Sequence, residues 1–282
     1  VPGKNGNALQ LTGDDGVNLG VGNFKRTQPF SVALWMNTPH HKERTVVFSR
    51  SKAWTDAGSR GYQMLLRDGH LSTSLIHFWP GNAINIRTTA KLPKNEWHHV
   101  TITYDGSTRA AGLAIYVDGK PVETEIHKDN LYKNITGGGN DHIVIGQRFR
   151  DVGFAKGLVD DFRVFDRELT SAEVAQLHDG QTLTKLLAKP TDALGQAERD
   201  ALRTYYLATA NESHTKQLAK LRDAREKVTQ LLDGKTEIMV MEEMKVKPRS
   251  TFVLNRGVYD QPGERVGPET PAILPPFPKG AP

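Results

Sequence analysis

The chain contains no cysteine among its 282 residues. This absence excludes disulfide bonds, thiolate metal ligands and cysteine nucleophiles. It also excludes the Cys-x-x-Cys-His motif that attaches a c-type haem, so we expect no haem in this chain. Long apolar runs are missing as well, since no stretch of about 18 consecutive apolar residues is present that could span a membrane. Neither absence indicates the compartment in which the protein works.

The chain also has no large excess of charge of either sign. The 37 Lys and Arg residues are nearly balanced by 32 Asp and Glu residues, which leaves a net charge of +5. The two signs are interspersed along the chain, without the basic block typical of nucleic-acid binding. We therefore expect a solvated surface and no nucleic-acid partner. With 37% hydrophobic residues, the chain is apolar enough for one large β domain and further elements.

Residues 5–168 carry many short apolar runs that are separated by turn residues. The clearest strand is expected over residues 30–37. Two further runs, 61–66 and 70–76, flank the sequence Arg67-Asp68-Gly69, which is typical of a β-hairpin turn. Many short strands punctuated by turns predict an antiparallel β-sandwich.

The segment Gly157–Thr170 is the most informative part of the chain. Its first half alternates apolar and charged residues, which is the pattern of a strand with one buried face. Thr170 and Glu173 have the spacing of a capping box, in which each side chain accepts a hydrogen bond from the backbone of the other. We therefore expect a helix over residues 171–179 that ends at Gly180, where a left-handed residue is least costly.

Four segments resemble, in the same order, the laminin-G-like, concanavalin-A-like family of jelly rolls. They are Ala8-Leu9-x-Leu11-x-Gly13, Phe30-Ser31-Val32-x-x-Trp35, Trp97-His98-His99-Val100 with Tyr116-Val117-Asp118-Gly119, and Asp160-Asp161-x-Arg163-Val164. The resemblance covers about residues 5–178. It implies a mainly β fold, a laminin-G-like antiparallel β-sandwich jelly roll over residues 1–180. Domains of this kind bind ligands more often than they catalyse reactions.

Beyond the sandwich, apolar residues recur every three or four positions, which predicts helices. We expect a helical connector over residues 181–236, with helices over about 195–210 and 214–232 or one long helix across both. Residues 237–282 begin with a short strand candidate and continue as a Pro- and Gly-rich stretch. That composition predicts a mostly extended tail without a core of its own.

The tail resembles the start of a C-terminal domain of unknown function in large planctomycete proteins. The matching segments are Ile238-Met239-Val240-Met241-Glu242-Glu243 and Arg249-Ser250-Thr251-Phe252-Val253-Leu254-Asn255-Arg256-Gly257. Those proteins also carry cytochrome-c-like domains. The resemblance implies that the chain is an internal piece of an exported multidomain protein, located in the periplasm or at the cell surface. Neighbouring domains of the same polypeptide would then be among its partners.

Two acidic pairs predict a structural calcium site. Asp14 and Asp15 lie in the first turn, and Asp160 and Asp161 lie on the closing strand. Because the resemblance implies that the first and last strands are neighbours, we expect the two pairs to converge. Carboxylate and carbonyl oxygens are the ligands that Ca²⁺ prefers. The alternative is turn chemistry for the first pair, and for one member of the second either an ion pair with Arg163 or the capping of a loop.

Two loop tryptophans, Trp54 and Trp79, predict a carbohydrate site, because an exposed Trp is costly and its ring suits the apolar face of a sugar. Arg side chains match the oxyanions of a sulfated or otherwise anionic glycan. The remaining members of the expected ligand set are Arg50, Arg60, His77, Asn82 and Arg87. The alternative is that both tryptophans are buried against the helical connector, which would make the sandwich a structural docking domain.

Catalytic and zinc chemistry have little support. Glu123 and Glu125 share one strand face but resemble a solvated edge rather than the paired carboxylates of a glycoside hydrolase. His98 and His99 are adjacent on a strand, point to opposite faces and cannot bind the same zinc ion. We therefore expect a non-catalytic carbohydrate-binding or adhesion module. A structural spacer in a larger haem-containing protein is the alternative, and a glycoside hydrolase is the least favoured interpretation.

Overall fold

The computed structural model describes residues 1–52, 59–236, 238, 249–257, 259–267, 270 and 273–275. The chain forms two compact units, residues 1–235 and residues 236–282. The first unit contains a β-sandwich followed by four α-helices, and the second contains a small hairpin. Among the described residues, no helix is both long and apolar enough to cross a membrane.

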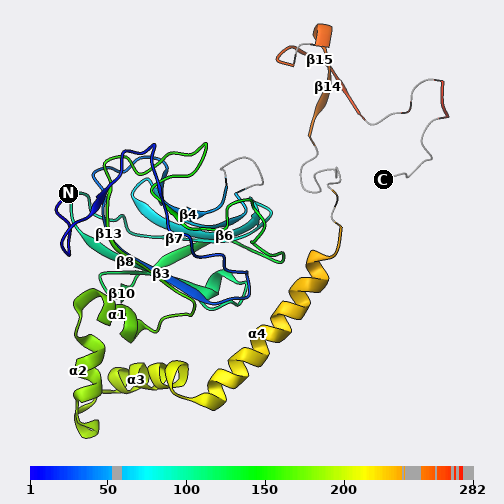
Figure 1. Ribbon diagram of the computed structural model, residues 1–282. Coiled ribbons are helices and arrows are strands. Elements are labelled where there is room, and N and C mark those ends of the chain that lie inside the picture. Colours follow the sequence, from blue (N-terminus) through cyan, green and yellow to red (C-terminus); the bar gives the residue numbers. More distant parts are fainter. Residues whose placement is uncertain are drawn as a thin grey trace. The chain divides into compact units, whose positions relative to one another are not determined.

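The sandwich consists of two antiparallel sheets, which confirms the predicted fold (Figure 1). The six-stranded sheet has the order β1-β13-β3-β8-β9-β10, and the seven-stranded sheet has the order β11-β7-β6-β5-β4-β12-β2. The strands of the first sheet are β1 Leu9–Gln10, β3 Phe30–Asn37, β8 His98–Tyr104, β9 Leu113–Val117, β10 Lys120–Pro121 and β13 Leu158–Phe165. Those of the second are β2 Val17–Asn18, β4 Thr45–Arg50, β5 Gly61–Arg67, β6 His70–Phe78, β7 Asn82–Thr88, β11 Thr124–Asn130 and β12 Val144–Ile145.

The hairpin predicted around Asp68 and Gly69 is present. Arg67 pairs with His70 across the turn, and both central residues have positive φ, 53° at Asp68 and 88° at Gly69. Two central residues with positive φ give the tight turn that matches the right-handed twist of paired strands. The turn sets the register of β5 against β6, and these strands carry the candidate site at their other ends.

The core lies between the two sheets. Alternate residues of β3, namely Val32, Leu34 and Met36, point inward and are fully buried. At one end an aromatic group closes the core, with the Phe30 ring 4.7 Å from the Tyr62 ring and 5.6 Å from the Tyr104 ring between centroids. Each such large apolar side chain contributes about 1.5–3 kcal/mol by leaving water. The alternation seen in the sequence is therefore what places one face of each strand in the core.

The outer face of the six-stranded sheet is covered by α1 (Ser171–Asp179), which lies against it in Figure 1. Trp35 belongs to this face, and only 5% of its surface is exposed. Its ring lies 5.2 Å from the His99 ring and 5.5 Å from the His178 ring of α1. The Lys4 ammonium lies 4.7 Å from its ring centroid. The helix thus docks on an aromatic and imidazole layer, in which Trp35 is a packing residue.

The predicted capping box and helix end are confirmed. The Thr170 hydroxyl accepts from the Glu173 backbone N–H at 3.4 Å, and the Glu173 carboxylate accepts from the Thr170 backbone N–H at 2.9 Å. Gly180 ends the helix with φ 72°. The structure therefore has the strand β13 followed directly by the helix α1, as the sequence of this segment predicts.

The sequence predicted either two helices over about 195–210 and 214–232 or one long helix across both, and the structure has two separate helices there. These are α3 (Gln196–Thr209) and α4 (Glu212–Asp233), and the Asn211 side chain caps α4 by accepting from the His214 backbone N–H. A further helix, α2 (Thr182–Ala188), was not predicted, because seven residues are too few for a clear period. Short 3₁₀ turns occupy Ala110–Gly112, Thr191–Ala193 and Asn255–Gly257.

The second unit is less extended than predicted. Its strands β14 (Thr251–Leu254) and β15 (Pro262–Val266) pair as an antiparallel hairpin. All residues of both strands are exposed, which agrees with the prediction that this stretch has no core of its own. Of the strand candidate at residues 238–241, only Ile238 lies within the described residues.

The burial of His99 beside α1 predicts that the stability of the fold depends on pH. Burial, followed by the neighbouring His178, lowers the pKa of His99 from 6.5 to about 4. Asp118, Asp161 and Arg163 also face this ring. A depressed pKa means that the neutral ring is the form suited to the folded state. The free energy of unfolding should therefore be highest above about pH 6.5 and fall by up to about 3 kcal/mol as pH drops to about 4.

Urea unfolding of wild type and His99→Gln across this range measures the effect. We expect the variant to lose most of the fall in stability, because its amide does not titrate. Equal pH dependence in the two proteins would contradict the assignment. His127→Gln is the matched control, because His127 lies on the exposed edge strand β11.

Candidate functional site

The candidate site lies at the turn between β6 and β7, at one end of the seven-stranded sheet. Trp79 occupies this turn, is half-buried and is joined to Pro80 by a cis peptide bond. Its neighbour Phe78 has 52% of its surface exposed. Asn130 of the edge strand holds the turn by donating from its side-chain amide to the Gly81 carbonyl at 2.8 Å. Two aromatic rings are therefore presented at the rim of the sandwich.

Arg60 and His77 form a polar pair beside this turn. The Arg60 guanidinium donates to the His77 backbone carbonyl and lies 3.3 Å from the His77 Nε2 atom. The His77 Nδ1 atom lies 2.6 Å from the Asn134 carbonyl, which can only accept, so Nδ1 carries the proton and Nε2 accepts from Arg60. Burial lowers the pKa of His77 most, and the positive charge of Arg60 lowers it further. His77 is thus a neutral side chain that orients Arg60.

A glycine loop, which we define as residues 136–141, lies next to this pair. A Cβ atom at Gly138 would come within 2.7 Å of the Arg60 carbonyl oxygen, so only glycine allows this approach. A Cβ atom at Gly139 would lie 3.0 Å from the Lys52 side chain. The loop is therefore in contact with two basic residues, Lys52 and Arg60, one on each side of the undescribed residues 53–58.

Arg50 supports the glycine loop from inside the fold. Its side chain is fully buried, and its guanidinium donates to the Ile135 carbonyl at 2.6 Å and to the Asn140 carbonyl at 3.3 Å. Asp141 lies 3.6 Å away and the Tyr62 ring centroid 5.8 Å away. The structure places Arg50 beneath the loop, with both terminal guanidinium nitrogens bonded to backbone carbonyls. Its expected contact with a ligand stays a prediction, and this burial does not favour it.

Asn82 has a similar internal role. It is buried, and its side-chain oxygen accepts from the backbone N–H groups of Tyr132 and Lys133 at 3.1 and 3.4 Å. Asn82 therefore holds the chain ahead of the glycine loop in place through its side-chain oxygen. Its expected contact with a ligand stays a prediction, and its burial does not favour it. Arg87 is half-buried on β7, where it pairs with Ser72 and Glu125 of the adjacent strands. The predicted site residue Trp54 lies outside the described residues.

The two acidic pairs do not converge. Asp15 accepts from the Thr12 backbone N–H at 2.9 Å, as expected of a turn residue, while Asp160 accepts from the Asn5 backbone N–H at 2.8 Å. Asp161 binds the Arg163 guanidinium through both oxygens at 2.8 Å. The strands are neighbours as expected, since β1 pairs with β13.

In the part of the chain that the structure describes, no three acidic or histidine side chains gather in a way that could hold a metal ion. The alternative of turn chemistry and an ion pair therefore fits Asp14, Asp15, Asp160 and Asp161 better than a shared site. Calcium binding itself stays a prediction, which calorimetric titration with Ca²⁺ would test.

Sequence reasoning missed Asn134 and Asp233. The Asn134 carbonyl accepts from His77, and the Asn134 backbone N–H donates to the Asp233 carboxylate of α4 at 3.0 Å. These contacts join residues 57 and 99 positions apart, so no local pattern could have indicated them. The glycine run itself was the only available signal that a loop here approaches another backbone closely.

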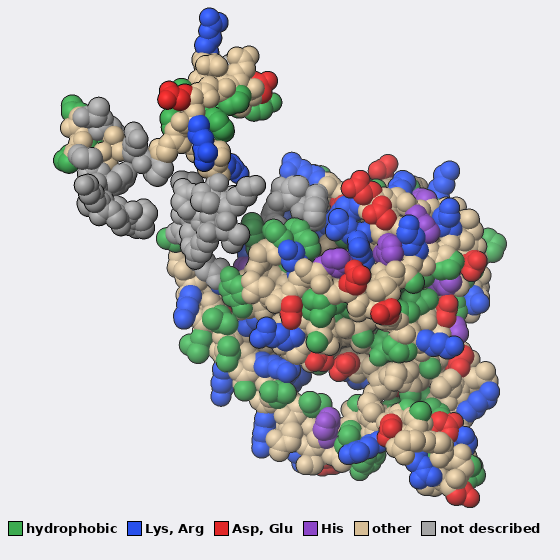
Figure 2. Space-filling model, turned by 180° about the vertical axis from the view of Figure 1, so that it is seen from behind, with side chains coloured by type: hydrophobic (Ala, Val, Ile, Leu, Met, Phe, Trp, Pro, Cys, Tyr) green, Lys and Arg blue, Asp and Glu red, His purple; other side chains and the backbone are tan. Residues whose placement is uncertain are grey.

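Charges of both signs are interspersed over the sandwich surface seen in Figure 2, without a single basic face. This distribution agrees with the expectation from the sequence. Lys52 and Arg60 at the glycine loop are a local arrangement of positive charge that suits an anion.

Comparison with known proteins identifies the family and the fold. The profile described as the concanavalin A-like lectin/glucanases superfamily matches residues 11–175. The binding domain of Paraclostridial Mosquitocidal Protein 1 has a TM-score of 0.49 and 17% identity over 64% of this chain and 45% of that chain, so this chain spans less than half of it. No curated protein sequence matches the chain.

Two further solved structures have similar scores. The Ruminococcus gnavus IT-sialidase CBM40, solved with α2,3-sialyllactose, has a TM-score of 0.49 and 12% identity over 61% of this chain and 96% of that chain. The SAP-like pentraxin of Limulus polyphemus has a TM-score of 0.45 and 18% identity over 61% of this chain and 81% of that chain. At sequence identities this low, the similarity concerns the fold and says nothing about the function.

The internal role of Arg50 leads to a stability prediction. Arg50→Leu should lower the free energy of unfolding by about 3 kcal/mol, because the Ile135 and Asn140 carbonyls lose a charged donor in a buried setting. Arg87→Leu makes the same change at a half-buried position of the same sheet and should cost less than about 1 kcal/mol. Thermal and urea unfolding of both variants measure the difference. Equal losses would show that Arg50 is not the anchor of the loop.

Proposed function

Because this chain belongs to the concanavalin A-like lectin/glucanases superfamily, we propose that its sandwich is a non-catalytic carbohydrate-binding module. The observation that carries the proposal is the half-buried Trp79, which follows the exposed Phe78 in the turn after β6, two residues beyond His77, whose carbonyl accepts from Arg60. Aromatic rings of this kind suit the apolar face of a sugar ring, and the rest of the rim is polar. The module would belong to an exported multidomain bacterial protein.

The ligand we propose is an anionic glycan, either sulfated or carboxylated. Arg60 offers a planar donor fork that matches an oxyanion, and Lys52 adds a second positive charge beside the glycine loop. His77 is neutral and already donates to the Asn134 carbonyl, so it orients Arg60 and does not add charge. Selectivity for an anion would therefore depend mainly on Arg60.

The alternative function is a docking domain within a larger protein. The contacts of α1 and α4 with the sandwich support it, because both helices use side chains of the β domain as partners. Its sharper form expects Trp54 or Trp79 to be buried against residues 190–240. Trp79 is only half-buried, and Trp54 lies outside the described residues. A glycoside hydrolase has less support, because Glu123 and Glu125 lie at an edge, where Glu123 contacts Thr89 and Glu125 lies near His127.

Binding to a panel of neutral, carboxylated and sulfated oligosaccharides tests the proposal. We expect wild type to bind an anionic member and Trp79→Ala to bind it about tenfold more weakly, since the stacking surface is lost. Arg60→Gln should weaken binding of anionic glycans more than binding of neutral ones. Phe149→Ala is the matched control, because Phe149 is an exposed aromatic residue on a different loop, with 57% of its surface accessible.

Two results would contradict the proposal. One is the absence of binding to every glycan in the panel at millimolar concentration. The other is binding by Trp79→Ala at the wild-type affinity, which would place the ligand elsewhere on the sandwich. In that second case the docking alternative would account for the aromatic rim.

A further inference from the structure

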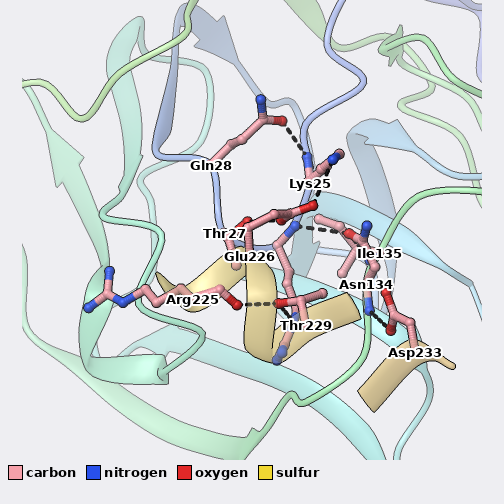
Figure 3. Close-up of polar contacts among 10 residues, drawn as sticks. Lys25, Thr27, Gln28, Asn134, Ile135, Arg225, Glu226, Thr229 and Asp233 are labelled. Carbon is pink, nitrogen blue, oxygen red and sulfur yellow. Dashed lines mark hydrogen bonds and ion pairs between the residues drawn. The ribbon is translucent and has the colours of Figure 1, made fainter. Parts of the chain in front are cut away.

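Helix α4 is attached to the sandwich by polar contacts rather than by an apolar face (Figure 3). Glu226 accepts a hydrogen bond from the Thr27 hydroxyl at 2.7 Å and forms an ion pair with Lys25 at 2.7 Å. Both partners of this ion pair are solvated, with side-chain exposures of 48% for Lys25 and 23% for Glu226. Of the 22 residues of α4, all of which the structure describes, only Thr229 is buried. The Lys25–Glu226 ion pair by itself is therefore weak and is screened by salt.

One turn further along α4, Arg26 links the helix to the chain that leads into the glycine loop. The Arg26 side chain is buried, donates to the Thr229 hydroxyl at 3.1 Å and donates to the Leu131 carbonyl at 3.0 Å. Its backbone N–H donates to the Asn134 side-chain oxygen at 3.1 Å. The docking surface of α4 and residues 131–134 are therefore held by the same residue, Arg26.

The end of α4 contacts this segment directly. The Asp233 carboxylate accepts from the Asn134 backbone N–H at 3.0 Å, and Figure 3 shows these two residues facing each other. On its other side, the segment contacts the candidate site. The Asn134 carbonyl accepts from His77, and the Ile135 carbonyl accepts from Arg50. Residues 131–135 thus have α4 on one side and the proposed ligand site on the other.

We propose that α4 is a positioning element for the ligand site, and that its release from the sandwich loosens residues 131–141 and weakens binding of an anionic glycan. The inference rests on the proposed function for its ligand and on the contacts above for its mechanism. Linkage makes the effect reciprocal, because a ligand that prefers the docked state stabilises docking by the same factor. The connector would then report occupancy of the sandwich to whatever follows it in the chain.

Charge reversal at Glu226 provides the test. Glu226→Lys replaces the ion pair with repulsion against Lys25 and removes the acceptor of the Thr27 hydroxyl, and neither partner belongs to residues 131–141. Because the Glu226 charge also acts on Arg26, the measured release of α4 is what ties a change in that segment to the helix. Glu212→Lys is the matched control, since it makes the same charge change on the same helix at an exposed pair with Lys216. Both variants gain equal positive charge, so a general attraction for anions cancels between them.

Three measurements are made on each variant of the whole chain. A spin-label distance between the sandwich and α4 reports release, hydrogen exchange reports the Asn134 and Ile135 amides, and titration with the anionic glycan reports affinity. In Glu226→Lys we expect a longer distance, faster exchange and affinity reduced about fivefold. In Glu212→Lys we expect the wild-type values.

The outcomes separate the two proposals. If wild type binds no glycan, the proposed function fails, while faster exchange in Glu226→Lys still supports positioning by α4. If α4 is released and both exchange and affinity stay at the wild-type values, the positioning role is overturned. If the distance does not lengthen despite the repulsion, the attachment is not the weak polar one inferred here, and the proposal is overturned on that ground.

Discussion

The inward face of β3 packs Val32, Leu34 and Met36 against the seven-stranded sheet, and the rest of the molecule depends on this burial. Because side chains alternate along a strand, filling the core with these residues forces Trp35 onto the outer face. That outer face then needs a cover, which α1 and its His178 provide. The position of the first helix is thus a consequence of how the core is filled.

Buried polar side chains, and not apolar packing, hold the loops at the rim of the sandwich. Arg50, beneath the glycine loop, binds two backbone carbonyls, and Asn82 binds two backbone N–H groups. Buried polar groups of this kind stabilise a loop only while every partner is present, and they become costly when one is removed. The same side chains that give the rim its shape are therefore unsuited to contacting a ligand.

Binding and docking need not be competing functions for this sandwich. Residues 131–135 contact α4 through Asp233 and contact the rim through His77 and Arg50. A ligand at the rim and a helix at the opposite side would act on the same short segment. In a multidomain protein, an arrangement of this kind couples a binding surface to the chain that follows it, provided that the helix has two states.

Local patterns in the sequence determined the strands, the Asp68-Gly69 hairpin, the capping box at Thr170 and the family, because each depends on residues that are close along the chain. The presence of an aromatic and basic rim could also be predicted in outline. Only the tertiary structure decided which polar residues face inward, that Asp160 accepts from the backbone of Asn5, and that α4 docks on residues 25–27 and 131–134. These outcomes depend on contacts between residues far apart in sequence, where burial and available partners, and not residue type, set the role of a side chain.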